Sequence, residues 1–276
     1  MAALSSTNKL YVTSCACGPA FEGYGIEMGM KAVEGAVVKV EAKNGNYFDC
    51  KTVGNTKALG IAGSGLLSAV NAFLENGIIN QNGSFSADEK AEKKYLTPEV
   101  YLTQKDIRNF QLAKGALYSG LKVLNSLCDE DFRNSSSFLS SVDCKSVDVA
   151  SDDVVQGDVV PDDVVQGDFK TCAVLSETEN ALTEKVLPLK NRKYLYLAGG
   201  FGTKLNIQEA ENVRLFPEEL CKNVVQCGNA AVTGAVMLAL NRKYRILSEK
   251  LCSKAKVINL AEMENFQPLY ISSLNF

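Results

Sequence analysis

The sequence of 276 residues contains no histidine. Imidazole is the usual general base of serine and cysteine catalytic triads, and it is the commonest side-chain ligand of metals in proteins. Its absence excludes those triads, histidine-bound zinc and imidazole proton relays. Any chemistry in this chain must therefore use carboxylates, amides, backbone N–H groups, lysine or arginine, or a metal that a bound ligand carries.

Long hydrophobic runs are also missing. No window approaches the roughly 18 uninterrupted apolar residues that a membrane helix needs, and Met1–Ser14 has no signal-peptide pattern. The formal net charge of −3 gives no basis for binding nucleic acid or an anionic membrane. We expect a cytoplasmic protein with neither kind of partner.

The nine cysteines are an odd number and are scattered along the chain, which is typical of a reducing compartment rather than of a disulfide framework. Only Cys15 and Cys17 lie close together, and C-x-C alone is a weak metal signature. Small buried thiols that pack like hydrophobic groups are the favoured interpretation. We therefore predict no metal site.

Segments of strand and helix character alternate along the chain. Lys9–Ser14, Ala36–Val40 and Tyr194–Ala198 have the composition of strands, and the last reads as a buried strand. A helix is expected to begin with Ser64 as its N-cap and to end at Gly77. The pattern predicts an α/β fold, a mixed sheet flanked by helices.

The clearest helix begins at Thr103, which forms an acidic capping box with Asp106. An apolar stripe follows at helical spacing. It comprises Ile107, Phe110, Leu117, Leu121 and Leu124. Gln104, Arg108 and Gln111 occupy another face of the same helix.

Regular patterning fails over residues 128–192, which contain the tandem repeat SDDVVQGDVV–PDDVVQGDFK. Between Asp143 and Asp168 eight aspartates and one lysine give a local charge of −8 + 1 = −7. Such a segment cannot build a packed core, and a calcium loop needs a fuller set of oxygen ligands. We predict a mostly disordered acidic insertion within one domain that spans residues 8–276.

Three glycine-rich turns stand where strands meet helices or loops. They are Gly18–Gly23 (GPAFEG), Gly60–Gly65 (GIAGSG) and Gly199–Gly202 (GGFG). Turns of this kind present backbone N–H groups to an anion such as phosphate. A glycine in a turn can instead reflect a positive φ angle. None of the three matches the P-loop or the dinucleotide fingerprint.

The ordered motifs TSCACGPAFEGYGIEMGMKA, GIAGSGLLSAV, YLTQKDIRNFQLAKGAL, YLAGGFG and CGNAAVTGA carry a family resemblance. The chain resembles the C-terminal domain of the reductive activators of corrinoid proteins. These activators are ATP-dependent members of the superfamily of actin, sugar kinases and heat-shock chaperone ATPases. The likeness runs from about Lys9 to Phe276 without the acidic insertion.

The resemblance implies one α/β lobe of ribonuclease-H type, of the two that close around ATP with Mg²⁺. It places Gly18–Gly23 at the phosphates and Gly199–Gly202 at the adenosine. The implied nucleotide-binding residues are Gly18, Ala20, Glu22, Gly23, Gly63, Ser64, Gly65, Gly199, Gly200, Phe201, Gly202, Gly228 and Asn229. Gln104 and Asp106 take the implied catalytic positions, where a polar side chain orients the attacking water.

The implied activity uses ATP to drive electron transfer from an iron–sulfur centre to cob(II)alamin, with a corrinoid protein as partner. This chain shows no four-cysteine cluster pattern and no Asp-x-Gly-Thr-Thr motif of the first lobe. We therefore expect the iron–sulfur cluster to be absent from it. A partner chain that supplies the first ATPase lobe and a ferredoxin domain, or a homodimer, then becomes an expectation.

Two alternatives remain open at this point. The first is a non-catalytic binding or regulatory module that keeps the fold of the lobe. The second is a sugar or acid kinase of the same superfamily. It is less favoured, because the catalytic aspartate of the first lobe is not visible in this sequence. A fold alone does not decide between these functions.

Overall fold

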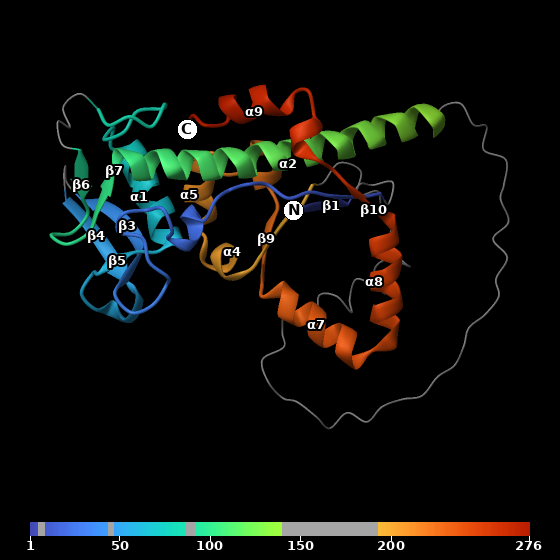
Figure 1. The fold of residues 1–276 in the computed structure, drawn as a ribbon, viewed down its shortest axis with the longest axis horizontal. Helices are drawn as coiled ribbons and strands as arrows, with labels where there is room; N and C mark the ends of the chain where they lie inside the picture. Colours follow the sequence, from blue (N-terminus) through green and yellow to red (C-terminus); the bar gives the residue numbers. More distant parts are fainter. Residues whose placement is uncertain (5–8, 44–46, 87–91, 140–192) are drawn as a thin grey trace. The chain divides into compact units, whose positions relative to one another are not determined.

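The computed structural model describes residues 1–4, 9–43, 47–86, 92–139 and 193–276, with backbone alone for residue 4 and residues 132–139. These segments belong to one compact unit that contains Met1–Phe138 and Lys193–Phe276. Figure 1 shows their elements. Residues 140–192, with the repeat on which the predicted insertion rests, lie outside the described residues.

The strands of the described residues pair both in parallel and antiparallel. One sheet has the order β1 (Ala2–Leu4), β2 (Leu10–Val12), β10 (Ala255–Val257), and another has the order β4 (Tyr47–Thr52), β3 (Ala36–Lys43), β5 (Gly60–Ile61). Two strand pairs complete them, β6 (Lys93–Tyr95) with β7 (Tyr101–Thr103), and β8 (Leu195–Ala198) with β9 (Val224–Gly228). β2 lies antiparallel to β1 and parallel to β10, and β3 likewise has one neighbour of each kind, so the predicted mixed sheet is confirmed.

Eight helices are present among the described residues. They are α1 (Gly63–Glu75), α2 (Gln104–Leu139), α4 (Gly200–Lys204), α5 (Ile207–Asn212), α6 (Glu218–Cys221), α7 (Ala230–Leu240), α8 (Arg242–Lys254) and α9 (Phe266–Ser272). Short 3₁₀ turns lie at η1 (Ala20–Glu22), η2 (Val53–Asn55) and η3 (Leu260–Glu262). In the described part of the chain, no helix is long and apolar enough to cross a membrane.

Helix α1 begins through close backbone packing rather than through a side-chain cap. A Cβ atom on Gly63 would lie 2.0 Å from the carbonyl oxygen of Phe21, and one on Gly65 would lie 2.1 Å from that of Val37. The N-cap is Ala62, without a side-chain hydrogen bond, so the prediction of Ser64 as N-cap is wrong. The C-terminal signal is confirmed, because α1 ends at Glu75 and Gly77 has φ 66°.

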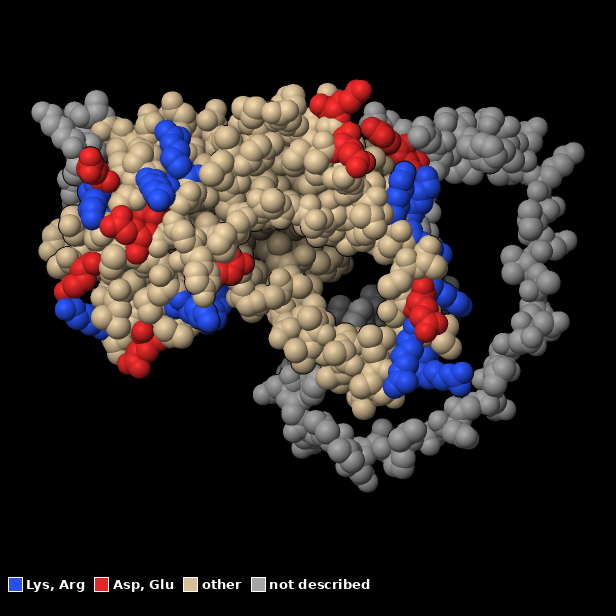
Figure 2. Space-filling model, in the orientation of Figure 1, with Lys and Arg blue, Asp and Glu red and all other residues tan. Residues whose placement is uncertain are grey.

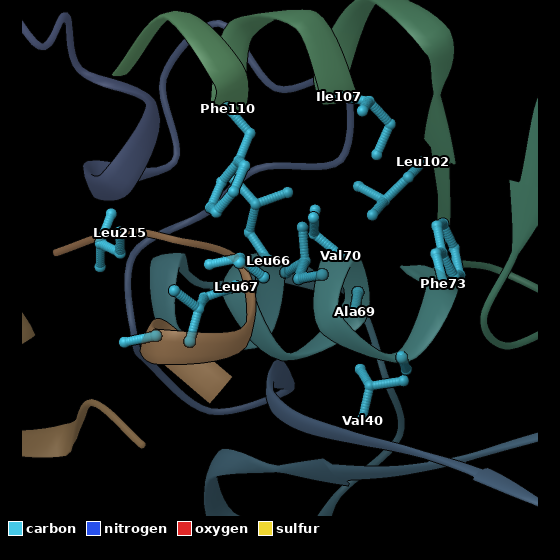
Figure 3. Close-up of a cluster of buried hydrophobic side chains, with 14 of the residues drawn as sticks. Val40, Leu66, Leu67, Ala69, Val70, Phe73, Leu102, Ile107, Phe110 and Leu215 are labelled. Atoms are coloured by element: carbon cyan, nitrogen blue, oxygen red, sulfur yellow. The ribbon is translucent and has the colours of Figure 1, made fainter. Parts of the chain in front are cut away.

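The main core lies between α1 and α2. Ile107 and Phe110 of α2 point toward α1, where Leu66 and Val70 face them (Figure 3). All four side chains are buried. The first part of the apolar stripe predicted for α2, at Ile107 and Phe110, thus faces α1. The C-terminal end of α2 lies further along the chain than the sequence indicated. The helix reaches Leu139 and so includes the first residues assigned to the insertion.

The N-terminus of α2 forms the predicted capping box. The Thr103 N–H donates to Asp106 Oδ2 at 2.8 Å, and the Asp106 N–H donates to Thr103 Oγ1 at 3.2 Å. Asp106 Oδ1 also accepts the N–H of Glu27 at 2.9 Å. The buried Asp106 carboxylate therefore accepts hydrogen bonds from two backbone N–H groups, those of Thr103 and Glu27. It fastens the segment after η1 to the start of α2.

The polar face of α2 holds the C-terminal segment. Gln111 Nε2 donates to the carbonyl oxygen of Leu274 at 2.9 Å, and Lys114 Nζ donates to that of Asn275. The Lys114 side chain is fully buried. Burial, together with the nearby Arg214 guanidinium, lowers the pKa of Lys114 from 10.5 to about 7.

Strand β8 is more exposed than the sequence indicated, and helix α7 is exposed as well. Within Leu195–Ala198 only Leu195 is buried, and Tyr196 is 64% exposed, so the prediction of a buried strand is wrong. The reason is that β8 pairs with β9 alone in the described sheets. Helix α7 has no buried residue and no charged side chain, and its surface is uncharged in Figure 2.

The close contact of α1 with β3 generates a stability prediction. Gly65→Ala must displace the Val37 carbonyl group, and such overpacking typically costs about 1–3 kcal/mol. Gly234→Ala is the matched control, because its Cβ enters open space in α7 and alanine favours a helix by about 0.5–1 kcal/mol. Urea unfolding should show a loss for the first variant only. Equal midpoints would contradict the packing argument.

The capping box generates a second prediction. Asp106→Ala leaves the N–H groups of Thr103 and Glu27 without their acceptor, so the free energy of unfolding should fall by about 2 kcal/mol or more. Asp49→Ala removes an exposed carboxylate that pairs with Lys43 and should leave stability nearly unchanged. Thermal melting of both variants checks this. An unchanged melting temperature for Asp106→Ala would overturn the structural role.

Lys114 generates a prediction about pH. Its folded-state pKa is about 7 and its unfolded-state value about 10.5, so the unfolded chain binds more protons between these values. The free energy of unfolding of the wild type should therefore rise with pH over this window, relative to Lys114→Met, by up to about 1.4 kcal/mol per pH unit. Urea unfolding of both proteins at pH 7, 8 and 9 measures the difference. Parallel pH curves would refute the lowered pKa.

Candidate functional site

The three glycine-rich turns meet at Phe21 of η1. The Phe21 carbonyl group contacts Gly63 at the start of α1. The Phe21 ring stacks on Phe201 of α4, with centroids 4.8 Å apart and an interplanar angle of 29°. Its edge meets Phe110 of α2 at 5.8 Å. Turns that lie nearly two hundred residues apart in sequence therefore form one site.

The glycines of this site fall into two groups according to the space around them. No atom lies within 4 Å of a Cβ built on Gly18, Gly199, Gly200 or Gly228. In contrast, Gly63 and Gly65 have backbone carbonyl groups in the place of a Cβ. The open glycines leave room for a flat base or a phosphate, whereas the packed ones have a structural role. Contact of Gly63, Ser64 and Gly65 with a nucleotide stays a prediction.

The turn predicted for the adenosine connects β8 to α4. The Gly199 N–H donates to the carbonyl oxygen of Gly228 at 2.7 Å, which joins this turn to the end of β9. Gly199 has φ 95°, a conformation that L side chains rarely adopt. Asn229 caps α7, with its Oδ1 accepting the Val232 N–H at 3.2 Å. Gly199, Gly200, Gly228 and Asn229 thus lie together.

A residue that the motif analysis missed supports this turn. Gln226 Nε2 donates to the carbonyl oxygens of Gly202 at 2.7 Å and Leu205 at 2.9 Å. The amide therefore fixes the middle and the C-terminal end of α4 to β9. Phe21 and Gln226 both support the glycines of this turn without belonging to GGFG. For Phe21, its position inside GPAFEG could have indicated its role.

The turn predicted for the phosphates is closed on itself. The N–H groups of Glu22 and Tyr24 donate to the Pro19 carbonyl oxygen at 3.2 and 3.0 Å, and the Gly23 N–H donates to that of Ala20 at 3.1 Å. These three donors are therefore engaged within the turn. An anion at this position must be met by the Gly18 end, where the backbone is exposed and has φ 63°.

Both predicted catalytic side chains have partners in the protein. Gln104 Oε1 accepts the Phe85 N–H at 2.9 Å, and its Nε2 donates to the Gly83 carbonyl oxygen at 2.7 Å. Asp106 caps α2 and holds Glu27. Their polar atoms orient the segment that includes Gly83 and Phe85 and the segment after η1, so the water-orienting role stays a prediction.

The structure also bears on metal chemistry. Over the described ranges there is no group of three or more Cys, Asp or Glu residues arranged to hold a metal ion. The absence of an iron–sulfur cluster from the chain stays a prediction.

Comparison with known proteins identifies the relatives. The chain is 26% identical to "Corrinoid activation enzyme RamQ" of Eubacterium limosum, over 99% of this chain and 40% of the relative. It is 28% identical to a "[Co(II) methylated amine-specific corrinoid protein] reductase" of Methanosarcina barkeri, over 42% of this chain and 24% of the relative. The chain thus spans well under half the length of either relative.

A solved structure shares the fold. It is described as "Reductive activator for corrinoid,iron-sulfur protein" and superposes with a TM-score of 0.65 at 23% identity, covering 98% of this chain and 37% of that chain. A family described as "C-terminal domain of RACo the ASKHA domain" matches residues 2–141 and 159–276. Since that match includes most of the chain, this protein belongs to the family of RACo C-terminal ASKHA domains.

Proposed function

We propose that this domain is the nucleotide-binding C-terminal lobe of an ATP-dependent activator that reduces a corrinoid protein from cob(II)alamin to cob(I)alamin in the cytoplasm. One observation carries the proposal: the stacked Phe21 and Phe201 rings join two distant turns, each of which contains open glycines. The names of the relatives support the corrinoid protein as partner.

We assign ATP with Mg²⁺ to these residues. The adenosine is assigned to the open space at Gly199, Gly200 and Gly228, and the phosphates to the exposed Gly18 end of the turn before η1. Phe201, stacked on Phe21, holds the two turns at a fixed separation. ATP hydrolysis supplies the free energy for an unfavourable electron transfer. The residues of this lobe bind and orient the nucleotide.

Phosphoryl transfer needs positive groups and metal on both sides of the γ-phosphate. We assign one of these sides to this domain, and the chain spans 40% of the length of the Eubacterium limosum relative. We therefore infer that a first ATPase lobe and a ferredoxin-type redox centre act together with this domain. Alone, the domain should bind nucleotide weakly and turn it over poorly.

A second function is a binding or regulatory module without catalysis. The bonding of Gln104 and Asp106 favours it, since the side-chain amide of the first and both carboxylate oxygens of the second already have protein partners. This module would keep the fold for protein contacts and would not depend on an open adenosine site.

Gly200→Val separates the two functions. The valine side chain enters the space beside Gly199, so Mg-ATP affinity should fall at least about tenfold, or about 1.4 kcal/mol, if nucleotide binds there. Gly234→Val is the matched control, because its Cβ also meets open space but lies in α7. Isothermal titration with Mg-ATP and circular dichroism measure binding and folding.

The outcomes of this experiment are distinct. Loss of binding in Gly200→Val alone supports the nucleotide lobe. Equal binding by Gly200→Val and the wild type contradicts the adenosine assignment, and no binding by the wild type favours the regulatory module. Tight binding with appreciable turnover by the wild type would refute the need for a second lobe.

A further inference from the structure

Two cysteines lie side by side just before the η1 turn. The Sγ atoms of Cys15 and Cys17 are 3.1 Å apart. The Cys17 N–H donates to the Cys15 carbonyl oxygen at 2.9 Å, so the three residues form a γ-turn with the exposed Ala16 at its tip. This backbone hydrogen bond keeps the two sulfur atoms in contact without a covalent bond.

The surroundings of the pair are partly open. Both side chains are half-buried, which leaves them accessible to a small molecule. Gly120 of α2 faces Cys15, and a Cβ there would lie 3.6 Å from that of Cys15. Other described cysteines differ, because Cys50 and Cys221 donate to backbone carbonyl groups instead of contacting a second thiol.

The contact between the sulfurs makes the two thiols unequal. A hydrogen bond from the Cys17 thiol stabilises the thiolate of Cys15 and lowers the pKa of Cys15 from 9.0 to about 7, whereas the pKa of Cys17 is raised. The charged or titratable groups that face the pair are Glu22, the Met1 amino group and Tyr270 of α9. At neutral pH Cys15 is therefore the nucleophile of the pair.

We propose that Cys15 and Cys17 form a dithiol site that low-molecular-weight disulfides oxidise reversibly to an intrachain disulfide. The sulfurs need to approach by only about 1 Å to reach the bond length of about 2.05 Å. A disulfide across so short a loop gains little from chain entropy. It should therefore be easily reduced again, as strained or exposed disulfides are.

The reaction balances in two exchange steps. The Cys15 thiolate attacks one sulfur of the small disulfide R–S–S–R, forming a mixed disulfide on Cys15 and releasing R–S⁻. Cys17 then loses its proton to solvent and attacks Cys15 Sγ, which releases the second R–S⁻. The protein loses two electrons and two protons, and the small disulfide becomes two thiols.

The consequence for nucleotide binding rests on the proposed function. Cys17 directly precedes Gly18, whose backbone that proposal assigns to the phosphates. Closing the disulfide tightens the γ-turn and moves the peptide that leads into Gly18. Oxidation should therefore weaken binding of Mg-ATP, and reduction by dithiothreitol should restore it.

Oxidised glutathione and peptide mass spectrometry test the dithiol itself. Trypsin releases Leu10–Lys31, which contains both cysteines and no other. After treatment of the full chain, this peptide should be lighter by two hydrogen atoms in the wild type, and dithiothreitol should reverse the change. In Cys17→Ser the resolving thiol is missing, so the peptide should instead keep glutathione on residue 15.

The exposed thiol of Cys252 serves as internal control for the oxidant. If Cys252 reacts while Leu10–Lys31 keeps two free thiols, the dithiol proposal is refuted. A stable glutathione adduct on wild-type Cys15, without loss of two hydrogens, would also refute it. Formation of the disulfide with unchanged Mg-ATP affinity would leave the dithiol established and contradict only its link to the proposed nucleotide site.

Discussion

A row of four phenylalanine rings connects the segments on which the site depends. Phe201 stacks on Phe21 with ring centroids 4.8 Å apart, and Phe110 stacks on Phe276 with centroids 6.1 Å apart. Phe21 and Phe110 join these two pairs through an edge-to-face contact, with centroids 5.8 Å apart. These rings come from α4, η1, α2 and the C-terminal segment. Each aromatic pair contributes about 0.5–1.5 kcal/mol of stability beyond the burial of its surface. The three pairs of this row therefore stabilise the contacts between turns that are distant in sequence.

Much of the local structure could be predicted from the sequence, because its signals are short in range. The Thr103–Asp106 capping box and the stop at Gly77 each depend on residues within one helical turn. The mixed α/β class followed from alternating strand and helix patterns. The position of Ser64 in α1 was misread because the N-terminus of this helix depends on contacts with Phe21 and Val37, which are distant in sequence.

The candidate site was only partly accessible in the same way. The presence of glycine in a sequence does not show whether the turn leaves open space or packs against a carbonyl group of another segment. This chain contains turns of both kinds. Exposure of β8 was likewise hidden, because a run such as Leu195–Ala198 gives no information on how many strands lie beside it. The role of Gln226 has no local signature, since both of its acceptors lie on another element.

The contacts of Gly63 and Gly65 have a consequence for comparing homologues. At either position even a methyl group must displace a carbonyl group, because the carbonyl oxygen lies about 2 Å from where the methyl group would stand. Natural selection for folding is therefore sufficient to keep glycine there during divergence, whether or not a ligand binds. Invariance of GIAGSG among relatives would be evidence of packing, whereas invariance of Gly200, which has no such neighbour, would be evidence of a ligand.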